Sequence, residues 1–299
     1  MQPMSNPKNM TMKLRARTEL RWNWPHLAVL ASLVPFVWLC GIAAVAPSAM
    51  LTLGTLLSLA WLMVAERRWP ARPEWTPGTH ELLRDGAFLG LNAVSDAAGA
   101  LVLSWLALYC AAAMPGLAAN WSPWIAVPAA VVLGELGPYA LHRWSHRGGW
   151  GWRVHAVHHA PTRVNASNNV TTHPINVLWN QFARTVPWLV LGFDANTIAW
   201  ASLFIQVQSF AVHANIAGTV GPLSRWIGSA ELHRWHHSAV QSEALNFGTA
   251  LALWDRVFGT YKAPSMVGPV RVGIAGLPSD AGWTLWRKML LAPMCSRCA

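Results

Sequence analysis

The stretch WIAVPAAVVLGELGPYALHRWSH, residues 124–146, runs from an apolar segment directly into a pair of histidines. Residues 124–141 contain no Lys or Arg and approach the roughly 20 residues that an α-helix needs to cross about 30 Å of hydrocarbon. His142 and His146 are four residues apart, so a helix that continues past the membrane places both imidazoles on one face. The stretch therefore predicts a membrane helix that ends in two side chains suited to binding a metal.

The rest of the chain has the same membrane character. Hydrophobic residues make up 54% of the 299 positions and charged residues only 11%, against about 25% charged in an ordinary soluble domain. Residues 27–46, 49–65 and 91–113 are further apolar runs without Lys or Arg. Two shorter runs, 177–192 and 197–213, predict a hairpin that crosses the membrane or enters it part way. We expect an all-α integral membrane bundle of four to six transmembrane helices, with a cytoplasmic histidine-rich cap that binds two metals.

The positions of the cations predict how this bundle is oriented. The formal net charge is +10, and the Lys and Arg residues gather before the first apolar run, after the second and after the fourth. The connections at residues 47–48 and 114–123 contain none. Under the positive-inside rule, the chain is a multi-pass protein whose termini and histidine clusters are cytoplasmic. Topology and anionic lipid then explain the excess charge, and we expect no nucleic-acid partner.

Composition divides the chain into four parts. They are a polar basic tail (1–24), N-terminal transmembrane helices with an interfacial connection (25–123), a catalytic region (124–262) and a C-terminal cytoplasmic tail (263–299). The connection, residues 66–88, is rich in Pro, and its Trp69 and Trp75 suit the headgroup zone of the membrane. Cys295 and Cys298 form a lone CxxC at the end of the chain, to which the sequence assigns no role.

The histidines indicate the chemistry. Eight of the twelve fall in three clusters at helical spacing, which are His142-x3-His146, His155-x2-His158-His159 and His233-x2-His236-His237. One metal takes about four protein ligands, so eight converging imidazoles predict a pair of metal ions. Imidazole suits iron, copper, nickel and zinc, and an all-nitrogen site with open positions is most useful to a redox metal that binds oxygen. Because the clusters flank the apolar runs, we expect the metals under the bilayer surface, where a lipid can reach them.

Single residues near the clusters have predicted roles of their own. His213 is a candidate ninth ligand, and Asn215 follows it closely enough to support a ligand or touch the substrate. His173 either holds water or substrate or has a structural role. A ligating imidazole usually donates its other N–H to an acceptor, and the carboxylates that could accept it are Glu135, Glu231 and Asp255. The alternative for these carboxylates is pairing with a nearby arginine.

Three further residues stand outside the clusters. His26 and His80 have no histidine neighbours at helical spacing, and we expect both at the membrane interface. Arg184 is the single cation in an apolar stretch, where it either contacts a headgroup or extends its side chain to the interface.

Longer motifs around the histidines carry a family resemblance across residues 130–262. They are Glu135-x3-Tyr139-x2-His142-Arg143-x2-His146, Arg153-x-His155-x2-His158-His159, His173-Pro174, His233-x2-His236-His237, Asn246-Phe247-Gly248 and Leu253-Trp254-Asp255-Arg256-x-Phe258-Gly259-Thr260-Tyr261. This set resembles the fatty acid hydroxylase and sterol desaturase superfamily of membrane-bound di-iron oxygenases. The chain departs from the family's pattern at Glu135, where Asp is usual, and at Asn176, where an acidic residue follows the His-Pro pair.

The resemblance implies a function and its cofactors. It makes the eight clustered histidines, with His213, the ligands of two iron ions, and O2 a co-substrate. The implied reaction is hydroxylation or desaturation of an unactivated C–H bond in a fatty acyl, sterol or related lipid. Its electrons would come from a separate donor protein, of the ferredoxin or cytochrome type with its reductase.

Two other functions stay open on the sequence alone. A membrane zinc hydrolase of lipid amides or esters needs only three protein ligands and a water on one metal. A haem-binding electron carrier would use single histidines from facing helices rather than clusters, and a Soret band would reveal it.

Overall fold

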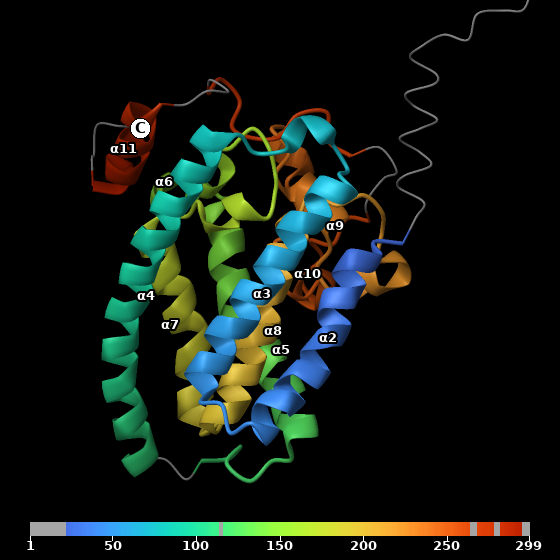
Figure 1. The fold of residues 1–299 in the computed structure, drawn as a ribbon. Helices are drawn as coiled ribbons and strands as arrows, with labels where there is room; N and C mark the ends of the chain where they lie inside the picture. The colour runs from blue at the N-terminus through green and yellow to red at the C-terminus, as the bar shows by residue number, and fades with distance from the viewer. Residues whose placement is uncertain (1–21, 114–115, 264–267, 278–281, 295–299) are drawn as a thin grey trace, which may run out of the picture.

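The fold is a bundle of long helices with a cap of short helices and loops at one end (Figure 1). The computed structural model describes residues 22–113, 116–263, 268–277 and 282–294. Within these ranges, the only β-structure is a few isolated bridges, such as the one between Trp22 and Thr219. The predicted all-α bundle is confirmed, whereas Cys295 and Cys298 lie outside the described residues.

Four of the long helices are apolar enough to cross a membrane. They are α2 (Trp24–Ile42), α3 (Pro47–Arg68), α4 (Thr79–Ala113) and α5 (Pro123–Ser145). Two further long helices, α7 (Pro174–Leu191) and α8 (Ala195–His213), pack against them. The short helices are α6 (Gly149–His159), α9 (Ala230–His236), α10 (Leu253–Val257) and α11 (Trp283–Leu291). The 3-10 turns are η1 (Pro73–Trp75), η2 (Ser167–Val170), η3 (Gly221–Arg225), η4 (Gln241–Glu243) and η5 (Ala292–Met294).

The helix α4 begins well before the apolar run that predicted it. The run starts at residue 91, but the helix starts at Thr79, so much of the predicted interfacial connection is helical. Glu81 accepts a hydrogen bond from the backbone N–H of Gly78 through its Oε2, at 2.7 Å, which satisfies a donor at the helix start. The first turns are polar, and hydropathy alone therefore misses them.

Small residues let α5 and α7 approach each other closely. A Cβ on Gly137 would lie 2.6 Å from the carbonyl oxygen of Ala183, and a Cβ on Gly134 would lie 2.3 Å from the ring of Trp188. Trp188 is buried and donates its indole N–H to the carbonyl of Ala130 at 2.7 Å. Glycines at such contacts let helix backbones pack at short range in membrane proteins. This seam fixes α7 beside the helix that carries His142.

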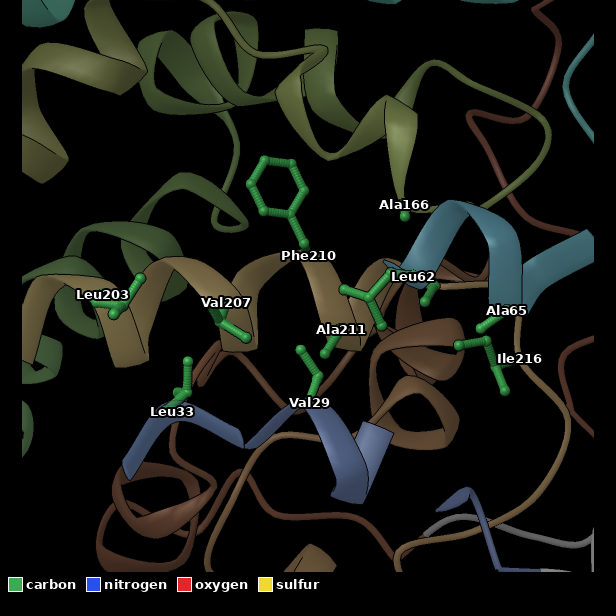
Figure 2. Packing of buried hydrophobic residues seen from close by; sticks show 11 residues of the cluster. Val29, Leu33, Leu62, Ala65, Ala166, Leu203, Val207, Phe210, Ala211 and Ile216 are labelled. Carbon is green, nitrogen blue, oxygen red and sulfur yellow. The ribbon is translucent and has the colours of Figure 1, made fainter. Parts of the chain in front are cut away.

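The helix α8 lies at the centre of the bundle. Its Leu203, Val207 and Phe210 pack against Val29 of α2 and Leu62 of α3 (Figure 2). Nearly the whole length of α8 is buried or half-buried, although α8 is not among the candidate membrane spans. Protein contacts therefore surround α8, and its last residue, His213, is held at the capped end of the bundle.

Two residues expected at the membrane interface are buried in the protein. Trp75 is only 5% exposed, because it packs with Val164 and Val272 in a small core beneath the cap. His26 is fully buried, because its Nε2 meets the side-chain oxygen of Gln208 on α8. Both residues pair with segments far away in the chain, which the local sequence does not indicate.

Candidate metal centre

Nine histidines converge at the capped end of the bundle and form two neighbouring sets. The five-histidine set contains His142, His146, His155, His159 and His236, and the four-histidine set contains His158, His213, His233 and His237. In each set, one ring nitrogen from every member lies within 4.8 Å of the others. The eight clustered histidines and His213 are therefore brought together as predicted, and their role as ligands stays a proposal.

The chain divides adjacent histidines between the two sets. His158 and His159 are neighbours on α6 but belong to different sets, as do His236 and His237 at the end of α9. Successive side chains on a helix point about 100° apart, whereas residues four apart share a face. In each HxxHH motif, one of the two adjacent imidazoles therefore belongs to the five-histidine set and the other to the four-histidine set.

Carbonyl and amide oxygens orient the rings by accepting hydrogen bonds from their Nδ1–H groups. In the five-histidine set, His142 donates to the carbonyl of Phe247 at 2.6 Å, and His236 donates to the carbonyl of Leu245 at 3.1 Å. His155 donates to Oδ1 of Asn176 at 2.8 Å in the same way. Because these oxygens only accept, the proton is on Nδ1 and the Nε2 atoms carry lone pairs. The tautomers therefore present Nε2 to the centre of the set.

The Nε2 atoms of the histidines gather at the centre of each set. The Nε2–Nε2 distance is 3.1 Å in each of four pairs, His155 with His159, His159 with His236, His158 with His213, and His233 with His237. The Nε2 atoms of His142 and His146 are buried and make no hydrogen bond. A buried ring nitrogen that lacks a hydrogen-bond partner is satisfied when it ligates a cation. The donor set therefore fits metal ions, and an all-nitrogen set suits iron, copper, nickel or zinc.

Burial keeps these imidazoles neutral. It lowers the pKa of His155 to about 4 and the pKa of His233 to about 3. Desolvation also lowers the pKa values of His158, His159 and His237 well below 6.5. Repulsion between neighbouring imidazolium charges lowers these pKa values further. A histidine binds a metal only in its neutral form, so the cage is in its ligating state at neutral pH before any ion binds.

The predicted carboxylates Asp255 and Glu135 do not accept hydrogen bonds from the imidazoles but from the backbone of a neighbouring loop. Asp255 accepts the N–H groups of Phe247 and Gly248, at 2.7 and 2.8 Å, and so holds the loop whose carbonyl orients His142. Glu135 accepts the N–H of Ala250 at 2.7 Å in the same loop.

Other charged groups at this end pair away from the histidines. Glu135 also makes a 3.4 Å ion pair with Arg184, which gives that arginine a partner inside the bundle. Glu231 accepts a hydrogen bond from the hydroxyl of Thr219 at 2.8 Å.

His173 and Asn215 make structural hydrogen bonds. His173 begins α7, where its Nδ1 accepts the N–H of Ile175 and its Nε2 donates to the carbonyl of Leu290. Asn215 donates to the carbonyl of Arg72 and accepts its N–H. These bonds support the structural role that the sequence left open for His173, and a substrate contact by either residue stays a prediction.

The sequence alone did not predict a role for some residues around the histidines. Asn168 accepts the Nδ1–H of His213 at 3.1 Å, and two carboxylates, Glu66 and Asp85, are buried beside the loop that carries it. The ring of Trp152 lies 5.4 Å from that of His146. The signal that could have found Glu66 is its position as a lone acid at the end of an apolar run.

Comparisons with known proteins agree with this geometry. Residues 127–260 match the family model for fatty acid hydroxylase. The ornithine lipid hydroxylase OlsE of Rhizobium tropici is 28% identical over 74% of this chain and 70% of its own length. The alkylglycerol monooxygenase of Homo sapiens is 26% identical over 48% of this chain and 32% of its own.

A probable Delta(7)-sterol 5(6)-desaturase of Neurospora crassa is 25% identical over 48% of this chain and 40% of its own length. This chain thus spans less than half the length of the last two relatives. No solved structure matches it. The matched family domain and these relatives confirm the resemblance to the fatty acid hydroxylase and sterol desaturase superfamily that the sequence motifs carry.

Proposed function

We propose that this protein is a membrane-bound, O2-dependent di-iron oxidoreductase that hydroxylates or desaturates an unactivated C–H bond of a lipid. The observation that carries the proposal is the pair of neighbouring all-histidine sets, with five and four members, beside membrane helices. The names of the relatives support it, because they describe a lipid hydroxylase, a monooxygenase and a sterol desaturase. A zinc hydrolase needs only one metal and three ligands, which leaves the second set without a purpose.

Iron bound by the two sets would supply the O2 chemistry that breaks the C–H bond. The protein's own residues hold neutral imidazoles in fixed orientations through acceptors such as Phe247 and Asn176. Most of the histidines are less than 10% exposed, which excludes bulk water from the place where the lipid carbon must lie. The donor set contains no carboxylate among the described residues, unlike the Glu-rich cages of soluble di-iron bundles.

The substrate is a lipid that reaches the cap from the bilayer. The name of the Rhizobium relative makes an ornithine lipid the first compound to assay, followed by alkylglycerols and sterols. Hydroxylation adds one oxygen atom to the product mass, and desaturation removes two hydrogens. Mass spectrometry of the extracted lipids therefore distinguishes the two reactions.

The electrons come from a separate donor protein that docks on the capped end. Exposed cations gather there, and they are Arg147, Arg256, Lys262, Arg271, Arg287 and Lys288. Such a surface suits an acidic ferredoxin or cytochrome, since complementary charge steers encounter between partners. The same cations support a cytoplasmic location of this end under the positive-inside rule. Full turnover by the isolated protein with a nicotinamide cofactor alone would overturn the need for a separate donor.

The first test is the metal content of protein purified in detergent from iron-supplemented cells. We expect about two iron ions per chain and lipid oxidation that requires both O2 and an electron donor. One zinc ion per chain, with lipid hydrolysis in the absence of O2, would replace this proposal with the hydrolase.

A further inference from the structure

Two buried carboxylates stand at the capped ends of membrane helices and have no part in the function proposed above. Glu66 is near the end of α3 and Asp85 is near the start of α4, and they are 5% and 3% exposed. A buried carboxylate is costly unless hydrogen bonds satisfy its oxygens. The partners of each therefore show what the carboxylate holds in place.

Glu66 joins two segments that are distant in the sequence. Its Oε2 accepts the backbone N–H of Ala166 at 2.6 Å and the backbone N–H of Asn215 at 2.8 Å. Ala166 lies in the loop between α6 and α7, and Asn215 lies two residues after the end of α8. A single carboxylate oxygen thus fixes the distance between this loop and the end of α8.

Asp85 holds the same loop from the other side. It accepts the hydroxyl of Ser167 at 2.7 Å and the hydroxyl of Thr171 at 2.9 Å. Arg84 lies 2.6 Å from its Oδ1 and balances its charge. Glu66 and Asp85 therefore anchor the loop at residues 166, 167 and 171 to two membrane helices.

The contacts that these segments make with imidazole rings go to the four-histidine set. The loop carries Asn168, whose Oδ1 accepts the Nδ1–H of His213 at 3.1 Å, and His213 is itself two residues from Asn215. Its Thr172 hydroxyl lies 3.5 Å from Nδ1 of His158. His158 and His213 both belong to the four-histidine set. By contrast, the five-histidine set takes its acceptors from Phe247, Leu245 and Asn176.

We infer that Glu66 is a positioning residue for the four-histidine set alone. It holds two segments together: the loop whose Asn168 orients His213, and the chain just after His213. The inference rests on the two metal sites of the proposed function but not on the identity of the metal. Loss of Glu66 leaves two buried N–H groups without an acceptor and frees Asn168 to move away from His213. The four-histidine set then loses its ion, while the five-histidine set keeps its own.

The experiment counts ions in protein that has been purified in detergent and loaded with Zn²⁺ or Fe²⁺, then desalted. Wild type should hold about two ions per chain, and Glu66→Ala should hold about one. Glu74→Ala is the matched control, since Glu74 is an exposed acid on η1, and it should hold two.

Double variants identify which ion is lost. His237→Ala disables the four-histidine set and His146→Ala the five-histidine set. Glu66→Ala with His237→Ala should hold about one ion, as either single variant does, because both act on the same site. Glu66→Ala with His146→Ala should hold close to none. Three results would overturn the inference. They are two ions in the single variant Glu66→Ala, no ion in that variant, or double variants in which the loss is larger with His237→Ala than with His146→Ala.

A conservative variant covers the case in which Glu66→Ala does not fold. Both N–H groups bond to one oxygen of Glu66. The amide oxygen of Glu66→Gln can accept both, while its NH2 group replaces the other carboxylate oxygen. This variant should hold two ions and release one of them to a chelator several times faster than wild type, with the other unchanged. Equal acceleration of both ions, or of neither, contradicts the inference. A wild type with fewer than two ions instead overturns the two-metal premise of the proposed function.

Discussion

Asp255 offers the sharpest test of how the cap holds its five-histidine set. It is 1% exposed, and it accepts hydrogen bonds from the backbone N–H groups of Phe247 and Gly248 and from the hydroxyl of Thr260. Asp255→Ala removes both carboxylate oxygens and with them all three hydrogen bonds. The Thr260 hydroxyl keeps its 2.8 Å contact with Tyr139, but the two N–H groups have no other partner in this loop.

The cost follows from those two N–H groups. A buried donor without a partner costs about 1–3 kcal/mol, so Asp255→Ala should lower the free energy of unfolding by about 2–6 kcal/mol. Asp255→Asn keeps one acceptor oxygen and should cost about half as much. The free energy of unfolding of a whole protein is typically about 5–15 kcal/mol, so the alanine variant should also unfold at a clearly lower temperature.

The assay is thermal unfolding in detergent, combined with the ion count of the folded fraction. Movement of the Phe247 carbonyl removes the acceptor that orients His142, so the remaining folded protein should bind its ion in the five-histidine set more weakly. A variant with an unfolding temperature within about 1 °C of wild type, and with unchanged ion retention, would refute this account of the loop.

Three further predictions use other parts of the structure. Gly137→Ala puts a Cβ 2.6 Å from the backbone oxygen of Ala183 and should cost about 1–3 kcal/mol of stability; an unchanged unfolding temperature contradicts the close α5–α7 seam. Burial lowers the pKa of His155 from 6.5 to about 4, so chelator-treated protein should lose stability as the pH falls from 6.5 to 4. The loss is on the order of 3 kcal/mol from this group, and stability that stays flat over that range would count against a buried neutral ring. His236→Ala should abolish activity and lower ion content, whereas His80→Ala, at an exposed position, should change neither; equal losses in both would indicate instability instead of ligand chemistry.

Periodicity predicts the parts of this fold that repeat locally. Apolar runs without cations located the four membrane helices, and i, i+3 and i+4 spacing grouped the histidines. Local patterns fail where a partner is distant in the chain. The start of α4 at Thr79 and the burial of Trp75 depend on polar first turns and on contacts with residues 164 and 272.

The same limit applies to the surroundings of the histidines. Sequence reasoning expected carboxylates to orient the imidazoles, but backbone carbonyls such as that of Phe247 do so, and every residue has a carbonyl. A backbone acceptor cannot be recognised from the residue type. The carboxylates Asp255 and Glu66 act through loops, so their roles became visible only when the loops were placed.

The length of α4 sets the height of the cap above the membrane. Its 35 residues measure about 50 Å at about 1.5 Å each, whereas the hydrocarbon core is about 30 Å thick. The apolar part of the helix begins at residue 91, so the excess lies at the capped end and includes Asp85. An α4 whose apolar part spans the hydrocarbon would therefore hold the capped end at the level of the lipid headgroups. For the proposed lipid oxidation, distance from the headgroup, rather than from the tail end, would then decide which carbon of the lipid reaches the site.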